Sequence, residues 1–255
     1  MNNVHLVGGL DIAELTFFAF FLFFLGLVWF LRGEDRREGY PTEDDLTGID
    51  GSNNDPLFFK PAKTFKLPHG MSETSTDGPR DPMPKNVLAR GWSGEPLDVV
   101  GDRLTSGLGP ASICQRADRP DVDMHGDPRI VPLRVMSHPV TVHENDVEPR
   151  GLPVFGLDGG KAGTVKELWM DRSESCLRYL EVDLDGGAGT VLMPIMMAEV
   201  SPRGVMTDAI TGGQFATVPR LASADQITLL EEEKITAYFG AGYLWATPER
   251  AEPLI

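Results

Sequence analysis

One long hydrophobic run stands out near the start of the chain. Residues 15–31 are apolar except for Thr16, and the run reaches about twenty residues when 12–14 are included, enough for a helix to cross a bilayer. No later segment repeats such a run. The pattern therefore predicts one transmembrane helix over 12–31, with almost all of the remaining chain on one side of the membrane.

The charges that flank this run predict its orientation. No Lys or Arg precedes it, whereas Arg32, Arg36 and Arg37 follow it at once. Positive residues collect on the cytoplasmic side of a membrane helix, so we expect a periplasmic tail over 1–11 and a cytoplasmic C-terminal part. A cleaved secretory signal would instead carry its positive charges before the apolar run.

The segment that follows the predicted helix lacks hydrophobic periodicity. Residues 32–109 are rich in Pro, Gly, Asp, Ser and Thr. An irregular stretch of this length rarely packs into a compact domain by itself. We therefore expect an extended segment on the cytoplasmic surface that becomes ordered against another protein.

Short β-type runs begin after about residue 130. Leu180, Val182 and Leu184 alternate with acidic residues, as in a strand that is buried on one face. The glycine-rich residues 185–189 then form a hairpin connection. Regularly spaced short strands predict a small antiparallel barrel over 110–222, and the expected strands are 140–143, 152–157, 163–170, 177–184 and 190–195.

The end of the chain has a helical pattern over 223–255. Ser223, followed three residues later by Gln226, resembles a capping box. Apolar and long side chains then recur at helical spacing, and glycines at 240 and 242 can end the helix. The acidic run 231–233 is expected on its solvated face.

Composition narrows the possible partners. The 255 residues carry a formal net charge of −15, which argues against nucleic acid and against broad adhesion to anionic lipid. An acidic cytoplasmic surface attracts cations, including protons. The two cysteines form no CxxC motif, as expected for reduced thiols rather than a disulfide framework.

The densest group of ligand-type side chains is Asp121, Asp123, His125 and Asp127. It resembles the first half of a calcium loop, but the position that should hold a bidentate Glu is Pro132. From the residues alone, three interpretations remain: a weak transition-metal site, a surface site for proton exchange, or a solvated acidic loop.

A second acidic group follows the predicted strand 168–170. Asp171 and Glu174 form either an ordinary turn or a pair of titratable groups near a buried path. No nucleophile elbow, P-loop, HExxH or dinucleotide-binding pattern is found in the chain. The sequence therefore makes a poor candidate for an enzyme.

Several long and unusual segments resemble the H subunit of the photosynthetic reaction centre of purple bacteria. They occur in the same order over nearly the whole chain, and they are residues 32–41, 61–70, 109–112, 130–135, 146–153, 168–174, 178–182, 226–234 and 243–250. The resemblance implies a single membrane helix and a β domain of the PRC-barrel type.

The resemblance also implies a function. Such a subunit is non-catalytic, binds no cofactor itself, and caps the cytoplasmic face of the L and M core subunits in the photosynthetic inner membrane. Those partners hold the bacteriochlorophylls, bacteriopheophytins, quinones and non-haem iron. An antenna ring, a cytochrome subunit and membrane lipids are further expected partners. The cap would shield the quinones from water and assist proton delivery to the secondary quinone.

Site residues follow from the same resemblance. Asp123 and His125 match surface positions where protons are taken up, and Asp171 and Glu174 match interior acidic positions. Some relatives have a second His where this chain has Asp127, which makes metal capture doubtful but leaves proton exchange open. Two other hypotheses remain: a PRC-barrel adaptor or assembly factor without pigment, and an anchored metal-dependent enzyme that uses the acidic group at 121–127.

Overall fold

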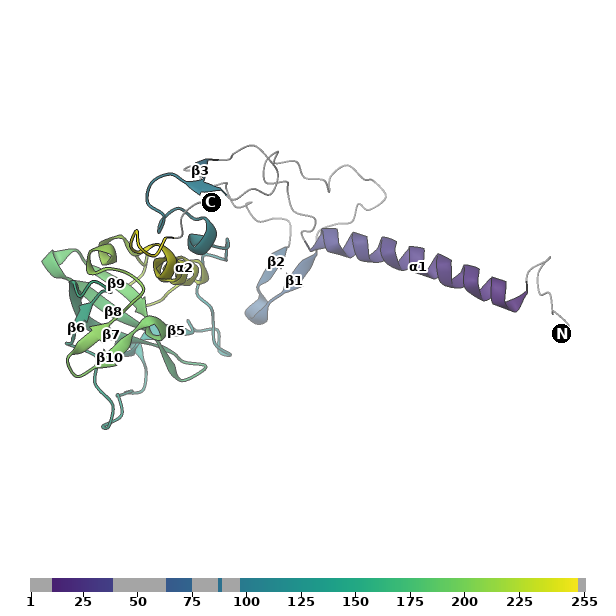
Figure 1. The fold of residues 1–255 in the computed structure, drawn as a ribbon. Coiled ribbons are helices and arrows are strands. Elements are labelled where there is room, and N and C mark those ends of the chain that lie inside the picture. Colours follow the sequence, from purple (N-terminus) through teal and green to yellow (C-terminus); the bar gives the residue numbers. More distant parts are fainter. Residues whose placement is uncertain (1–10, 39–62, 75–86, 89–96, 252–255) are drawn as a thin grey trace. The chain divides into compact units, whose positions relative to one another are not determined.

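The computed structural model describes residues 11–38, 63–74, 87–88 and 97–251 (Figure 1). The predicted tail 1–11, apart from Asp11, and much of the predicted extended segment 32–109 therefore lie outside the described residues. The chain divides into two units. One comprises residues 1–79 with 89–96, and the other comprises residues 80–88 with 97–255. Each unit is described by itself.

The first unit contains the long helix α1 (Ile12–Arg37). Its start is fixed by reciprocal bonds, in which the Glu14 N–H donates to the Asp11 carboxylate at 2.8 Å and the Asp11 N–H donates to Glu14 at 3.2 Å. The part from Ile12 to Asp35 is long and apolar enough to cross a membrane, which confirms the predicted helix. A short antiparallel hairpin, β1 (Thr64–Lys66) and β2 (Ser72–Thr74), completes the described part of this unit.

The second unit is built on a mixed sheet of seven strands. Six of them follow the order β10-β11-β6-β7-β8-β9, and β5 pairs with β7. Their bounds are β5 (Ile130–Pro132), β6 (Pro153–Phe155), β7 (Lys161–Asp171), β8 (Cys176–Leu184), β9 (Thr190–Pro194), β10 (Glu199–Ser201) and β11 (Gly204–Met206). A separate antiparallel pair joins β3 (Val87–Leu88) to β4 (Asp98–Val99).

Strand β7 organises this sheet because it pairs with three others. One of its edges pairs with β8 along most of its length. Its other edge pairs first with β6 and then with β5, where Ile130 lies opposite Asp171. The chain just before β5 therefore comes to lie beside the end of β7.

The structure confirms the expected mainly β domain, with differences in detail. Strands occur at the predicted runs 152–157, 163–170, 177–184 and 190–195, with β7 and β8 extending one or two residues beyond theirs, but 140–143 is not a strand. Strands β5, β10 and β11 were not predicted. The sheet is also not purely antiparallel, since β11 pairs in parallel with β6. Such a pairing joins strands about fifty residues apart, so no local periodicity reveals it.

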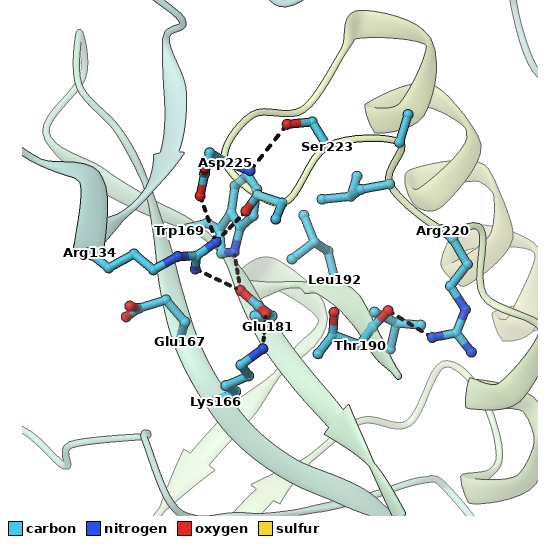
Figure 2. Close-up of a pocket in the computed structure, with 14 residues that line it drawn as sticks. Arg134, Lys166, Glu167, Trp169, Glu181, Thr190, Leu192, Arg220, Ser223 and Asp225 are labelled. Atoms are coloured by element: carbon cyan, nitrogen blue, oxygen red, sulfur yellow. Dashed lines mark hydrogen bonds and ion pairs between the residues drawn. The ribbon is translucent and has the colours of Figure 1, made fainter. Parts of the chain in front are cut away.

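The predicted alternation along β8 holds for the apolar residues and fails at Glu181. Leu180 and Val182 are fully buried, as expected, but Glu181 is also only 5% exposed. Its carboxylate accepts hydrogen bonds from Trp169 Nε1 at 3.1 Å and from Arg134 at 3.2 Å (Figure 2). These donors replace the water that a carboxylate on an open face would bind.

The C-terminal helix is α2 (Leu229–Trp245). Its capping box is formed by Thr228 and Glu231, not by Ser223 and Gln226 as predicted. Glu231 is therefore nearly buried rather than solvated. The helix buries Phe239 against Phe215, with ring centroids 5.8 Å apart.

Candidate functional site

The turn between β7 and β8 forms around the side chain of Asp171. This carboxylate accepts the backbone N–H groups of Ser173 at 2.9 Å and Glu174 at 3.0 Å. Aspartate favours such turns because its short side chain reaches the backbone two residues later. The turn closes at Ser175, whose φ is 54°. Asp171 is thereby fixed at the end of the strand and is fully buried.

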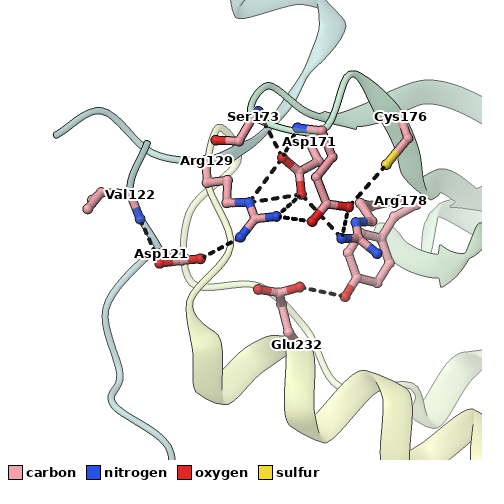
Figure 3. Close-up of polar contacts among 10 residues, drawn as sticks. Asp121, Val122, Arg129, Asp171, Ser173, Cys176, Arg178 and Glu232 are labelled. Carbon is pink, nitrogen blue, oxygen red and sulfur yellow. Dashed lines mark hydrogen bonds and ion pairs between the residues drawn. The ribbon is translucent and has the colours of Figure 1, made fainter. Parts of the chain in front are cut away.

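Arg129 connects this turn to two further carboxylates (Figure 3). Its Nε lies 3.0 and 2.9 Å from the two carboxylate oxygens of Asp171. Its Nη2 lies 2.5 Å from Glu174, and its Nη1 lies 3.2 Å from Asp121. One guanidinium thus holds together three acidic groups, two from the β7–β8 turn and one, Asp121, from a separate part of the sequence. We call Asp121, Arg129, Asp171, Glu174 and Arg178 the Arg129 cluster.

Arg178 on β8 is the second cation of the cluster. Its Nη2 lies 2.8 Å from Glu174 and 3.3 Å from Asp171. Glu174 therefore bridges two guanidinium groups, while its side chain stays 53% exposed in this chain. With three carboxylates and two guanidinium groups, the cluster has a formal charge of −1.

The surroundings hold Asp171 in its ionised form. Burial by itself raises the pKa of a carboxyl group, but the hydrogen bonds from Arg129 and from the backbone of Glu174 outweigh it and lower the pKa of Asp171. The hydrogen bond to Asp171 in turn raises the pKa of Arg129. Asp171 and Arg129 therefore form a permanent ion pair at neutral pH.

A half-buried acid, Glu232, lies beside the cluster on helix α2. The Tyr179 hydroxyl donates to the Glu232 carboxylate at 3.0 Å. Burial raises the pKa of Glu232, only partly offset by the Tyr179 hydrogen bond and the charge of Arg178. Glu232 therefore binds a proton more readily than an ordinary glutamate.

The residues 123–127 form a tight loop of their own. The Asp123 carboxylate accepts the backbone N–H of His125 at 2.8 Å and that of Asp127 at 3.1 Å. Burial of the carboxyl acts to raise its pKa, but these backbone hydrogen bonds are stronger together and lower the pKa of Asp123. The side chains of His125 and Asp127 are exposed.

The structure attaches this loop to the β7–β8 turn. The Arg129 N–H donates to the Asp121 carbonyl at 2.8 Å, and the Arg172 N–H donates to the Arg129 carbonyl at 2.9 Å. The Arg172 guanidinium donates to the Pro128 carbonyl as well. The loop of Asp123 is thus held next to the Arg129 cluster.

The structure therefore sorts the predicted site residues into two adjacent groups. Asp171 and Glu174 share the Arg129 cluster, whereas Asp123, His125 and Asp127 form the exposed loop. Sequence reasoning did not select three of the residues that link or extend these groups, namely Arg129, Arg178 and Glu232. Only weak sequence signals pointed to two of them: Arg129 follows an acidic loop, and Glu232 lies within an acidic helical run.

Metal binding has no support from this geometry. Within the described ranges, no three His, Cys, Asp or Glu side chains are grouped so that they could hold a metal ion. Instead, the Asp123 carboxylate accepts backbone N–H groups, and the Asp121 carboxylate pairs with Arg129. The hypothesis of a metal-dependent enzyme at this loop is therefore not supported by the described residues.

An apolar helix able to cross a bilayer, a mainly β domain and a C-terminal helix define a membrane-anchored protein with a barrel-type domain. Residues 143–214 match the PRC-barrel domain family. Residues 4–135, more than half of the chain, match the H-chain N-terminal region of the photosynthetic reaction centre. The chain belongs to the family of photosynthetic reaction-centre H chains, which are structural subunits associated with the core subunits.

Proposed function

We propose that the β domain carries protons from the cytoplasm to the secondary quinone of the core subunits. The observation that carries this proposal is the convergence of Asp121, Asp171 and Glu174 on Arg129, next to the exposed loop 123–127. A quinone that is reduced inside protein must gain protons, because an uncompensated buried anion is very unfavourable. Ionisable groups that lead inward from water can supply them.

The geometry suggests different roles for the acidic groups. His125 and Asp127 exchange protons with water, since imidazole and carboxylate groups are exposed there. Asp171 stays ionised because its pKa is lowered, so it acts as a fixed charge that orients Arg129. Glu174 and Glu232 are better carriers, since Glu174 reaches solvent and the pKa of Glu232 is raised.

The rest of the proposed role follows from the family. The chain caps the cytoplasmic face of the L and M subunits, shields the quinones from water and catalyses no reaction by itself. Bacteriochlorophyll, bacteriopheophytin, quinones and non-haem iron belong to those partners. Contacts with an antenna ring, a cytochrome subunit and lipids are part of the same proposal. The H-chain match favours this role over that of a PRC-barrel adaptor without pigment.

The proposal includes a cytoplasmic location for the β domain. Its support is the distribution of charge at the ends of α1, where acidic residues precede the span and arginines follow it. Cys114 offers a direct test because it is a free and exposed cysteine in the β-domain unit.

We expect a membrane-impermeant maleimide to label Cys114 in inside-out vesicles and not in sealed spheroplasts. The labelled chain is identified by mass, in a variant in which Cys176→Ser removes the other thiol. Labelling in detergent provides the control that the thiol is accessible. Labelling of intact spheroplasts would place the β domain on the periplasmic side.

Glu174→Gln tests the path itself. We expect the proton-coupled second electron transfer to the quinone to slow severalfold, because Gln keeps the size of the side chain and cannot carry a proton. Flash-induced absorbance kinetics on the assembled reaction centre measure this rate. The matched control is Glu144→Gln, which changes an exposed glutamate outside the Arg129 cluster. Equal rates for both variants and the unaltered complex would remove Glu174 from the path.

A further inference from the structure

A pocket of about 690 Å³ lies away from the Arg129 cluster, between strands β7–β9 and the segment 220–225 that precedes α2 (Figure 2). Sites for small organic ligands commonly have volumes of roughly 300–1,000 Å³. The pocket wall combines the partly exposed Leu221 with three cationic side chains, Arg134, Lys166 and Arg220, and three acidic ones, Glu167, Glu181 and Asp225. This mixture suits a ligand that has both an apolar and an anionic part.

Two of the acidic side chains in the wall are already neutralised. Glu181 accepts Trp169 Nε1, and its carboxylate lies 3.1 Å from Lys166 and 3.2 Å from Arg134. Arg134 also lies 2.9 Å from Asp225. A buried carboxylate with three donors projects little negative charge into the pocket. The third acidic side chain, Glu167, accepts the Leu168 N–H at 2.9 Å and lies 3.7 Å from Arg150. An incoming anion therefore meets only carboxylates that already have partners.

Arg220 is the cation on the opposite wall, and its partners are neutral. Its Nη1 donates to the Thr190 carbonyl at 2.7 Å, and its Nη2 donates to the Ala216 carbonyl at 3.3 Å. Among the residues that the structure describes, no carboxylate lies within ion-pair distance of this guanidinium. Its positive charge is uncompensated, and a guanidinium has five N–H donors in a fork that matches a carboxylate.

The apolar part of the wall adjoins this charge. Leu221 follows Arg220 and is partly exposed, whereas Val191 and Leu192, which follow Thr190 on β9, are buried beneath the pocket. A ligand held at Arg220 by its anionic group would therefore place its body against Leu221. We propose that this pocket binds a small organic carboxylate with an apolar body, with the carboxylate paired to Arg220. This site is independent of the proposed proton path.

The photoreactive carboxylate 4-benzoylbenzoate tests the proposal on the intact reaction centre. We expect irradiation to attach it to peptides that contain residues 190–192 or 221–225, which mass spectrometry identifies. Its amide, 4-benzoylbenzamide, has nearly the same shape without the charge and should label these peptides about tenfold less, given the strength of charge-assisted hydrogen bonds. Equal labelling by the amide would overturn the proposal.

Two variants separate the charge from the cavity. Arg220→Gln should reduce labelling about tenfold, and Ala222→Trp should block it by filling the pocket while Arg220 remains. The matched control is Arg203→Gln, another exposed arginine in the same unit, which should change nothing. Unaltered labelling in both pocket variants would refute the site, and displacement by inorganic phosphate as readily as by benzoate would refute the need for an apolar body.

Discussion

Replacing Asp171 with Ala is expected to lower the free energy of local opening of the β7–β8 turn by about 3 kcal/mol, because it removes a buried carboxylate that pairs with both Arg129 and Arg178, and a hydrogen bond to a charged group contributes about 1.5–3 kcal/mol. Asp171 is fully buried and pairs with Arg129 at 2.8 Å. The substitution also removes the acceptor of the Ser173 and Glu174 N–H groups. Few single changes in this domain should have a larger effect.

Backbone hydrogen exchange in the assembled complex measures this loss at the turn itself. The matched control is Asp185→Ala, which breaks an exposed ion pair with Lys161 at 3.0 Å. Exposed pairs contribute roughly 0–1 kcal/mol, so the control should barely change protection. If both variants lose the same protection, the Asp171–Arg129 pair does not hold the turn.

The contribution of Asp171 should also depend on pH in a defined direction. The pKa of Asp171 in the folded protein is lowered, so its stabilising effect is complete above the ordinary aspartate pKa of about 3.9. It is lost as the pH falls through the lowered, folded-state pKa. The difference in protection between the wild type and Asp171→Asn should therefore be constant near neutral pH and shrink in acid.

The double variant Asp123→Asn with His125→Ala is expected to slow the proton-coupled second electron transfer about tenfold. Groups that transfer protons commonly contribute roughly 10²–10⁴-fold to a rate, and the neighbouring Asp127 should preserve part of the uptake. Primary charge separation should be unchanged because it needs no proton. The asparagine introduced at position 123 can still accept the backbone N–H groups of residues 125 and 127 through its amide oxygen, so the loop keeps its shape.

Flash-induced kinetics over a range of pH check this prediction. The matched control is Asp146→Asn with His143→Ala, which removes an exposed aspartate and histidine from a different loop. The proton-uptake assignment fails if the first pair leaves the second electron transfer unaltered across pH. It also fails if the control pair slows that transfer to the same degree.

Much of the fold follows from short-range patterns in the sequence. The span of α1 was predicted from its apolar run. The helix continues beyond that run to Arg37, where Arg37 pairs with Glu34 at 3.0 Å. Strands β7, β8 and β9 were predicted from alternation and from the glycine-rich hairpin. Strands β5, β10 and β11 are only three residues long and show no periodic pattern, whereas the equally short β6 lies within the longer apolar run 152–157.

The capping box at the start of α2 was predicted at the wrong residues. Two Ser/Thr-x-x-Glu/Gln patterns lie five residues apart, and local sequence does not discriminate between them. The structure uses Thr228 and Glu231, since Glu231 also accepts the Ala222 N–H and thereby ties the preceding segment to the helix. This contact depends on where the segment before the helix lies in the folded domain. A four-residue sequence pattern carries no information about that position.

By itself, the sequence determined the membrane helix, the β character of the domain, the C-terminal helix and the family, because apolar periodicity, turn residues and sequence motifs are local properties. Tertiary structure alone decided that Arg129 would join Asp171, 42 residues later, to Asp121 and Glu174. It likewise decided that Glu181 would be buried and that Arg220 would face a pocket. The physical reason is that these ion pairs and hydrogen bonds join residues from different strands and loops. Their side chains come within bonding distance only after the sheet has formed.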